Sequence, residues 1–181
     1  MSEEMLIRHC SPTLAGIKTG NIFSCPCESA DRLRRDIRAL NRRLTPRGLC
    51  ILPLRISENS ALIYVYRPSR LRADLQTSDA AAVLMQRGYT VQNPSKCIAA
   101  LMGRLQNTAE FPHEIGLFLG YPVEDVIGFI ENRECKLSGA WKVYGDEVAA
   151  RSLFAKYKKC TDVYTKHHRA GKPIERLTIA K

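Results

Sequence analysis

Three residues of this chain have side chains that could perform thiol chemistry, although they lie far apart in the sequence. Cys10 could act as a nucleophile or redox thiol, His113 as its base, and Glu114 as an orienting group or second acid. Such chemistry requires an imidazole within hydrogen-bond distance of the thiol, so that the reactive thiolate can form. The order Cys then His is compatible with a nucleophilic cysteine but does not identify one. A thiol-dependent enzyme is therefore one interpretation.

The alternative interpretation gives these residues structural roles. Cys10 would be a buried, unreactive thiol and Glu114 a helix cap, since adjacent residues such as His113 and Glu114 do not easily face each other on a helix. Cys25 and Cys27 form the only close pair among seven cysteines, and CxC is not the usual spacing of zinc or redox sites. The N-terminus is acidic before it is basic, which is unlike an export signal. Reduced thiols are therefore expected, and no metal site is predicted.

One segment, residues 111–130, combines three glycines and two prolines with a mainly apolar sequence. Glycine costs about 1 kcal/mol relative to alanine inside a helix, so its presence indicates tight backbone geometry. A pocket is predicted where this segment meets residues 9–18, with Lys18 as an anion contact and Tyr121 as a further binding residue. The part 112–120 could be a helix or a buried strand, because periodicity cannot separate the two at this length.

Charge leads to a second, independent hypothesis. The chain has 28 Lys and Arg against 18 Asp and Glu, a formal net charge of +10. The excess lies at the two ends, since residues 1–50 and 141–181 are strongly basic while residues 91–140 are slightly acidic. Such a charge attracts acidic partners over long range. The candidate contact residues are Arg34, Arg38, Lys158 and Lys159.

Nucleic acid is a competing partner for the same charge. The arginine-rich helix predicted at 29–47 has no aromatic residue that could stack on a base. The segment 112–131 has the outline of a helix-turn-helix, but its second helix is acidic and would be repelled by phosphates. The chain contains no P-loop, dinucleotide fingerprint, HExxH helix or GxSxG elbow. A basic binding module for an acidic partner is the function expected first, with a thiol enzyme and nucleic-acid binding as alternatives.

Capping residues and periodicity predict the elements of the first half. A first helix is expected from Met5 until Ser11 and Pro12 interrupt it. Ser29 fits the N-cap of a helix that reaches about Leu44 and has apolar residues at helical spacing. Residues 49–56 and 61–66 have the pattern of a β-hairpin, and a proline at position 53 indicates an edge strand or a bulge.

In the second half, helices are predicted near 68–75, 78–87, 94–106 and 122–130, followed by a short strand at 142–144. The longest helix is predicted at about 147–169, and residues 174–179 are predicted to form a final strand. Strands that alternate with helical crossovers predict a mixed sheet backed by helices.

The expected fold is therefore α/β (α+β): a single domain, 1–181, with a small mixed sheet that includes the hairpin. Two lobes, 1–90 and 91–181, are the alternative organisation. A hydrophobic fraction of 45% and a charged fraction of 25% are typical of globular proteins. No apolar run approaches the roughly 20 residues that span a bilayer, so a cytoplasmic location without a membrane partner is expected.

Four segments in order along the chain are distinctive: HCSPTLAGIKTGNIFSC (9–25), VYRP (65–68), FPHEIGLFLGYPVEDVIGFIEN (111–132) and WKVYGDEVAARSLFAKYKKC (141–160). With them, nearly the whole chain resembles an uncharacterised domain-of-unknown-function family of small cytosolic proteins from clostridia-like anaerobic bacteria. The resemblance implies a single-domain protein with no established activity, and it leaves the cofactor unknown. Family members are often encoded near flavodoxin and ferrous-iron transport genes. This implies a flavodoxin-like protein as the acidic partner, in iron or redox physiology.

Overall fold

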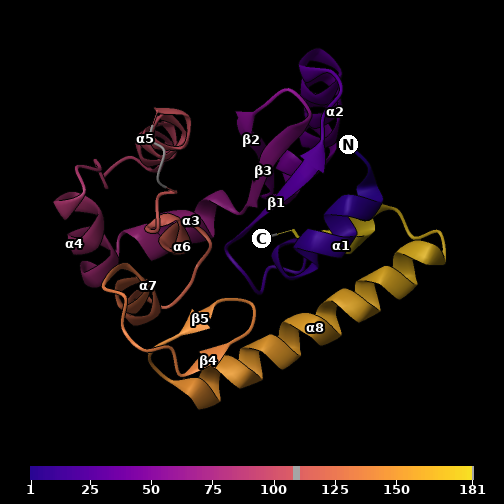
Figure 1. Cartoon of the computed structure of the whole chain (residues 1–181). Coiled ribbons are helices and arrows are strands. Elements are labelled where there is room, and N and C mark those ends of the chain that lie inside the picture. Colours follow the sequence, from indigo (N-terminus) through magenta and orange to yellow (C-terminus); the bar gives the residue numbers. More distant parts are fainter. Residues whose placement is uncertain (108–110, 181) are drawn as a thin grey trace. The chain divides into compact units, whose positions relative to one another are not determined.

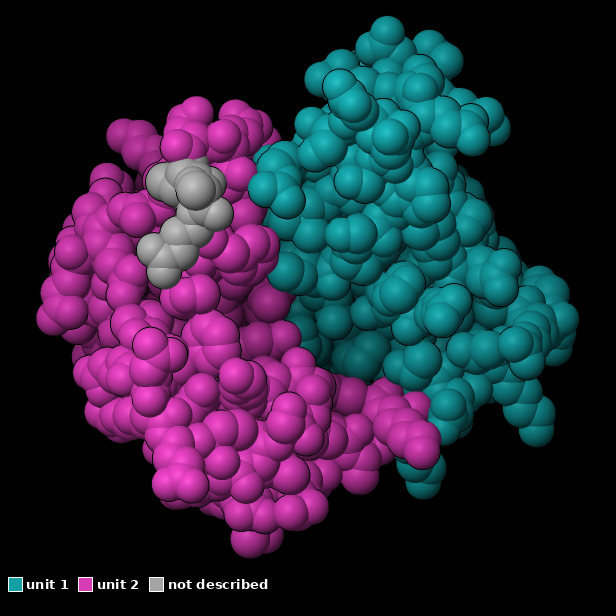
Figure 2. Space-filling model, viewed as in Figure 1, with its two compact units in different colours: residues 1–69, 159–181 teal, residues 70–158 magenta. Residues whose placement is uncertain are grey.

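The computed structural model describes residues 1–107 and 111–180, and Figure 1 shows the order of its helices and strands. The chain clusters into two compact units, which Figure 2 colours separately. Unit 1 comprises Met1–Ser69 and Lys159–Lys181, and unit 2 comprises Arg70–Lys158. These boundaries differ from the two lobes that the sequence suggested. The mixed α/β class and the long helix near the C-terminus are confirmed.

Unit 1 is built on a three-stranded sheet with the strand order β1-β3-β2. The strands are β1 (Gly20–Pro26), β2 (Cys50–Ile56) and β3 (Ser60–Tyr66). β2 and β3 form the predicted hairpin, and their register shifts between Pro53 and Arg55. The prediction that Pro53 marks a bulge or an edge strand is confirmed, because β2 is also an outer strand of the sheet.

The prediction of a mixed sheet is wrong, because each pair of described strands is antiparallel. A helical crossover between two strands predicts a parallel pair. Here β1 and β2 are connected through the helix α2 (Ala30–Leu44), and both run antiparallel to β3. They therefore run in the same direction but do not pair, because β3 lies between them.

Two helices cover this sheet with their apolar sides. α1 (Glu3–Leu14) contacts β1, and α2 contacts β2 and the short helix η1 (Thr45–Arg47). The hydroxyl of Ser29 accepts a hydrogen bond from the backbone N–H of Arg32, which confirms the predicted cap of α2. The predicted end of α1 at Ser11 and Pro12 is wrong, since the helix continues to Leu14 with Pro12 buried inside it.

The C-terminal residues form a short helix, α9 (Ile174–Leu177), and not the predicted final strand. Ile174 and Leu177 have helical spacing and are both buried in the core of unit 1. The buried guanidinium of Arg67 donates to the carbonyls of Thr13 and Leu14, each at 2.6 Å, and to that of Ile179 at 2.8 Å. One side chain from the end of β3 therefore holds together the C-terminal end of α1 and the last residues of the chain.

Unit 2 is mainly helical. Its elements are α3 (Pro68–Leu75) from Arg70 onward, α4 (Ser78–Gln86), α5 (Pro94–Asn107), α6 (Ile115–Phe118), α7 (Val123–Ile130), the two-stranded sheet β4 (Leu137–Ser138) and β5 (Lys142–Val143), and the first part of α8 (Glu147–Arg169). α8 matches the predicted range of the long helix. Trp141, Val143 and Ala150 form a small core in which β5 and α8 meet. The ambiguous segment 112–120 contains a four-residue helix, α6, and no strand.

Candidate functional site

A cavity of about 290 Å³ lies within unit 2, between α6, α7 and β5. We call it the aromatic pocket, after Tyr121, Phe129 and Trp141 in its wall. The described residues that line it are Phe111, His113, Ile115, Gly116, Tyr121, Asp125, Val126, Phe129, Trp141 and Lys142. Its volume is close to the lower end of the range for small-molecule sites, about 300–1,000 Å³, and mainly apolar walls with a few polar groups are typical of such sites.

Glycine allows α6 and α7 to approach each other closely at this pocket. A Cβ atom at Gly116 would lie 2.7 Å from Cγ2 of Val126 and 3.1 Å from Cδ2 of Tyr121. Gly120, with φ of 73°, provides the left-handed turn between the two helices. Pro122 then precedes α7 as its N-cap residue. The glycine-rich sequence therefore forms the close helix turn that shapes the wall of the pocket.

A buried carboxylate fixes the position of the tryptophan. Asp125 accepts a hydrogen bond from the indole N–H of Trp141 at 2.7 Å. Its other oxygen accepts from the backbone N–H groups of Tyr144 at 2.7 Å and Gly145 at 2.8 Å. Hydrogen bonds to a charged acceptor are stronger than neutral ones, so Asp125 ties β5 and the indole ring to α7.

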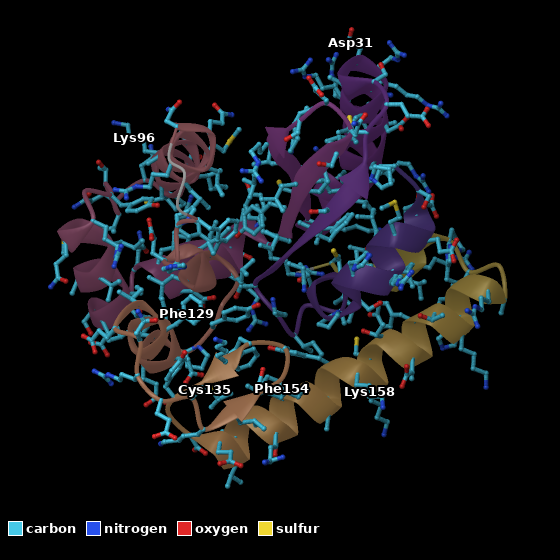
Figure 3. All side chains as sticks on the ribbon, in the orientation of Figure 1. Asp31, Lys96, Phe129, Cys135, Phe154 and Lys158 are labelled. Atoms are coloured by element: carbon cyan, nitrogen blue, oxygen red, sulfur yellow. The ribbon has the colours of Figure 1, made fainter. Side chains whose placement is uncertain are left out.

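The aromatic rings pack in defined geometries around Trp141. Tyr121 stacks on Trp141 with ring centroids 4.8 Å apart and an interplanar angle of 26°. Phe154 of α8, which Figure 3 labels, meets Trp141 edge-on with ring centroids 4.6 Å apart. Burial raises the pKa of Tyr121 to about 12, so its hydroxyl stays neutral at physiological pH. Trp141 therefore packs against two further aromatic rings, and Tyr121 adds an uncharged ring to the pocket wall.

Two basic side chains lie beside the ring of Phe129, which Figure 3 also labels. The imidazole of His113 meets this ring edge-on at 4.8 Å, and the ammonium of Lys142 lies 5.3 Å from its centroid. Such cation–π contacts hold a lysine near an apolar surface. His113 and Lys142 therefore form a polar side of an otherwise apolar cavity.

A second cavity of about 340 Å³ adjoins the first at Phe111 and His113, which line both. We call it the arginine pocket. It is lined by Arg87, Arg104, Phe111, Pro112, His113, Glu114 and Ile130. Because all residues of both cavities belong to unit 2, one compact unit contains an apolar pocket and a charged pocket next to each other.

The carboxylate of Glu114 is the buried centre of the arginine pocket. It accepts a hydrogen bond of 2.7 Å from the hydroxyl of Tyr89, whose pKa is raised by burial and by this bond. The guanidinium groups of Arg87 and Arg104 each lie 3.6 Å from one carboxylate oxygen. Glu114 occupies the N-cap position of α6, as the alternative interpretation predicted, but its side chain makes no capping hydrogen bond to that helix.

The residues of the predicted thiol site belong to different units. Cys10 lies in α1 of unit 1, fully buried, and this burial raises the pKa of its thiol. Lys18, also in unit 1, is buried and donates to the carbonyl of Gly20. His113 and Tyr121 lie together in the aromatic pocket of unit 2. The burial of Cys10 counts against a nucleophilic role, because the thiolate is the reactive form.

The predicted surface residues are exposed. Arg34 and Arg38 lie on the solvent side of α2, where Arg34 forms an exposed ion pair of 3.4 Å with Asp31. Lys158 and Lys159 are exposed on α8, and Figure 3 labels Lys158 and Asp31. An exposed ion pair contributes little to stability, so the pair of Arg34 with Asp31 can be exchanged at little cost. The four predicted side chains can therefore contact other molecules.

Sequence reasoning missed the residues that organise both pockets. It gave no pocket role to Trp141 or Asp125, and none to Arg87, Arg104 or Tyr89. A single tryptophan that follows a glycine-rich segment was the available signal for the aromatic pocket. Arg87 and Arg104 come from separate helical regions and converge only in the folded unit, so no local pattern marks them.

The described part of the chain contains neither a cluster of metal ligands nor a helix that could span a membrane. In residues 1–107 and 111–180 no group of three or more His, Cys, Asp or Glu side chains is placed to hold a metal ion. Cys25 and Cys27 are buried in the core of unit 1. Each of the seven cysteines is a free thiol. None of the described helices has the length and apolar character needed to cross a bilayer.

Unit 2 therefore contains two adjoining cavities, each about the size of a small-molecule site. Comparison with known proteins shows the family of the chain. It belongs to the family described as "Protein of unknown function (DUF3793)", whose model matches residues 6–178. The resemblance to an uncharacterised family is thereby confirmed. No curated protein and no solved structure matches the chain.

Proposed function

We propose that unit 2 binds a small organic molecule through the aromatic pocket. The observation that supports this most directly is the arrangement of Tyr121, Phe129 and Trp141 around a cavity of about 290 Å³. A planar apolar group of the ligand would lie against these rings, since aromatic rings attract each other in stacked and edge-on geometries. Asp125 accepts one hydrogen bond from the indole and two from the backbone that follows β5, so the ring is held in place before any ligand arrives, which lowers the entropy cost of binding.

The composition of the site favours binding over covalent catalysis. Among the described residues, neither pocket is lined by a serine, threonine or cysteine that could act as a nucleophile. The two described lining carboxylates already have partners. Asp125 accepts from Trp141, Tyr144 and Gly145, and Glu114 contacts Tyr89 and two arginines. A general base needs to reach a reacting proton, and these two groups are occupied by structural contacts.

The proposal can be tested with the protein's own fluorescence, because Trp141 is the only tryptophan of the chain. The probe is N-phenylnaphthylamine, a neutral aromatic compound that accepts energy from tryptophan. Titration should quench Trp141 emission and give saturable probe fluorescence. Replacing Phe129 with alanine removes one face of the pocket and should weaken binding about tenfold, equivalent to about 1.4 kcal/mol.

A matched control is Val148→Ala, which truncates an exposed apolar side chain of unit 2 that lies outside both pockets. It should bind the probe like the wild type. Thermal unfolding of each variant checks that the fold is retained. Absence of saturable binding, or equal binding by Phe129→Ala and wild type, would contradict the proposal.

A second candidate function is docking of an acidic protein on unit 1, for which a flavodoxin-like protein is the first candidate. The observation that favours it is a row of exposed arginines on α2, Arg35, Arg38 and Arg42, on the side opposite its buried leucines. Unit 1 has 17 basic and 8 acidic residues, a net charge of +9. A surface of one sign accelerates and orients the approach of an oppositely charged protein.

This candidate is tested with a polyglutamate peptide and a random-sequence RNA as probes, each titrated at about 20 mM and about 300 mM salt. An acidic-protein site should bind polyglutamate with a steep salt dependence and lose that binding in the double variant Arg38→Glu, Arg42→Glu. The matched control Arg72→Glu, Lys96→Glu makes the same charge change at exposed positions of unit 2. Preferential binding of RNA would favour the nucleic-acid alternative, and salt-independent binding would exclude electrostatic docking.

A further inference from the structure

The arginine pocket holds two positive groups beside a buried negative group. Glu114 is only 1% exposed, while the side chains of Arg87 and Arg104 are 34% and 38% exposed. Both guanidinium groups face this carboxylate and both line the cavity. A buried carboxylate requires a positive partner, because an unpaired charge is very costly to bury. The partly exposed guanidinium groups meet that requirement and can also reach a ligand in the cavity.

The contacts of Glu114 with the arginines leave room for another anion. A bidentate pair of arginine and carboxylate has N–O distances of about 2.7–2.9 Å. Both distances here are 3.6 Å, and the short hydrogen bond of Glu114 comes from Tyr89 instead. Both arginines therefore lie near the carboxylate at one edge of the pocket, and neither forms a bidentate pair with it.

Arg104 is held in position by two further contacts. Its guanidinium lies over the ring of Tyr89, 4.8 Å from the centroid, and it donates to the backbone carbonyl of Arg87. Stacking on an aromatic ring and a bond to a fixed carbonyl restrict a side chain that otherwise has large rotamer freedom. Charges that are already in place lose little entropy when a ligand binds.

The neighbouring aromatic pocket indicates which kind of anion would bind. His113 and Phe111 line both cavities, so a ligand that occupies the aromatic pocket can extend an anionic group past His113 toward the two arginines. We infer that the ligand of unit 2 is an amphiphilic organic anion, with an aromatic or apolar body in the aromatic pocket and an oxyanion in the arginine pocket. This inference rests on the proposed small-molecule function and specifies the chemical class of its ligand.

The inference is tested by comparing two probes that share one aromatic body. Anilinonaphthalene sulfonate carries a sulfonate, and N-phenylnaphthylamine is its uncharged analogue. The wild-type protein should bind the sulfonate about tenfold more tightly, a difference that corresponds to one favourable charge contact. This preference should shrink between about 20 mM and about 300 mM salt, because screening weakens partly exposed charge pairs.

Variants of Arg87 locate the anion contact. Arg87→Gln removes the charge while keeping a polar side chain, and it should abolish the preference for the sulfonate without changing binding of the neutral probe. Arg87→Lys keeps the charge and should restore part of the preference. The matched control Arg72→Gln removes an exposed arginine of α3 that lines neither pocket, and it should behave like the wild type. Competition by naphthoate and by naphthyl phosphate then shows which oxyanion the pocket prefers.

The possible outcomes separate this inference from the function on which it rests. Equal affinity for the two probes in the wild type would overturn the inference and leave the aromatic pocket as a neutral site. Failure of both probes to bind would overturn the proposed function itself. If Arg87→Gln weakened both probes equally, the effect would be structural and the anion contact would be rejected.

Discussion

The two units of this protein use charge in different ways. Unit 1 has a net charge of +9, whereas unit 2, with 11 basic and 10 acidic residues, has +1. In unit 1 the buried side chains of Lys18 and Arg67 donate hydrogen bonds to backbone carbonyls, and most arginines of α2 are exposed to solvent. Unit 2 gathers Arg87 and Arg104 around one carboxylate beside a cavity. Net charge therefore indicates long-range attraction, while local geometry indicates a binding site.

The largest effect that would test this difference is expected at Arg67. If its role is to bind carbonyls inside unit 1, Arg67→Met should remove the three hydrogen bonds that its guanidinium donates to Thr13, Leu14 and Ile179. The carbonyls of Thr13 and Leu14 would keep one backbone donor each. The free energy of unfolding should fall by about 3 kcal/mol or more, since a hydrogen bond that involves a charged group contributes about 1.5–3 kcal/mol. Urea unfolding measures the change. The control Arg38→Met alters an exposed arginine and should stay within about 0.5 kcal/mol; an equally small effect of Arg67→Met would refute the structural role.

A smaller effect is expected at the buried acid of unit 2. Asp125→Asn retains an oxygen for the backbone N–H groups but places an amide N–H₂ against the indole N–H of Trp141. The loss should be about 2 kcal/mol, typical of a hydrogen bond to a charged group, and the emission of Trp141 should shift as its ring moves. Binding of the neutral probe should weaken in parallel. Glu134→Gln, an exposed change of the same kind, is the control; an unchanged emission spectrum would show that Asp125 does not position the indole.

The smallest effect concerns the pH dependence of unit 1. Burial lowers the pKa of Lys18 to about 7 from 10.5, while Cys10 opposes the shift. Above pH 7 the unfolded chain holds a proton that the folded chain has lost, so stability rises with pH, by at most about 1.4 kcal/mol per unit. Above about pH 9 the raised pKa of the Cys10 thiol acts in the opposite direction, because the unfolded thiol ionises first.

We therefore expect the free energy of unfolding to increase by about 1–2 kcal/mol between pH 7 and pH 9. Lys18→Met should remove most of this slope. Chemical denaturation at a series of pH values measures it, and parallel curves for the two proteins would show that Lys18 does not titrate in this window.

The local sequence was sufficient to predict an element where a single residue or a simple apolar spacing determines the backbone conformation. Ser29 marks the start of α2, Pro53 marks the irregular edge strand, and the apolar spacing of 147–169 gives α8 its bounds. The prediction failed where distant contacts override a local rule. Pro12 does not end α1, because the last turn of that helix is buried and its final carbonyls are bound by Arg67.

The candidate site was only partly predictable for the same reason. The composition of 111–130 drew attention to His113 and Tyr121, and both line the aromatic pocket. The pairing of Arg87 with Arg104 depends on two helical regions that converge on Glu114 from different parts of the sequence. Charge counting could not find them, because unit 2 is nearly neutral as a whole.

The division of the chain also determines the order in which its parts become available during synthesis. Unit 2 is one continuous segment, Arg70–Lys158, and is complete before residues 159–181 have been synthesised. Unit 1 is made of residues 1–69 and 159–181, and its core includes Ile174 and Leu177. Part of the core of residues 1–69 therefore stays uncovered until Ile174 and Leu177 have been synthesised. Domains generally fold as units during translation, so unit 2 can fold first and unit 1 completes its core afterwards.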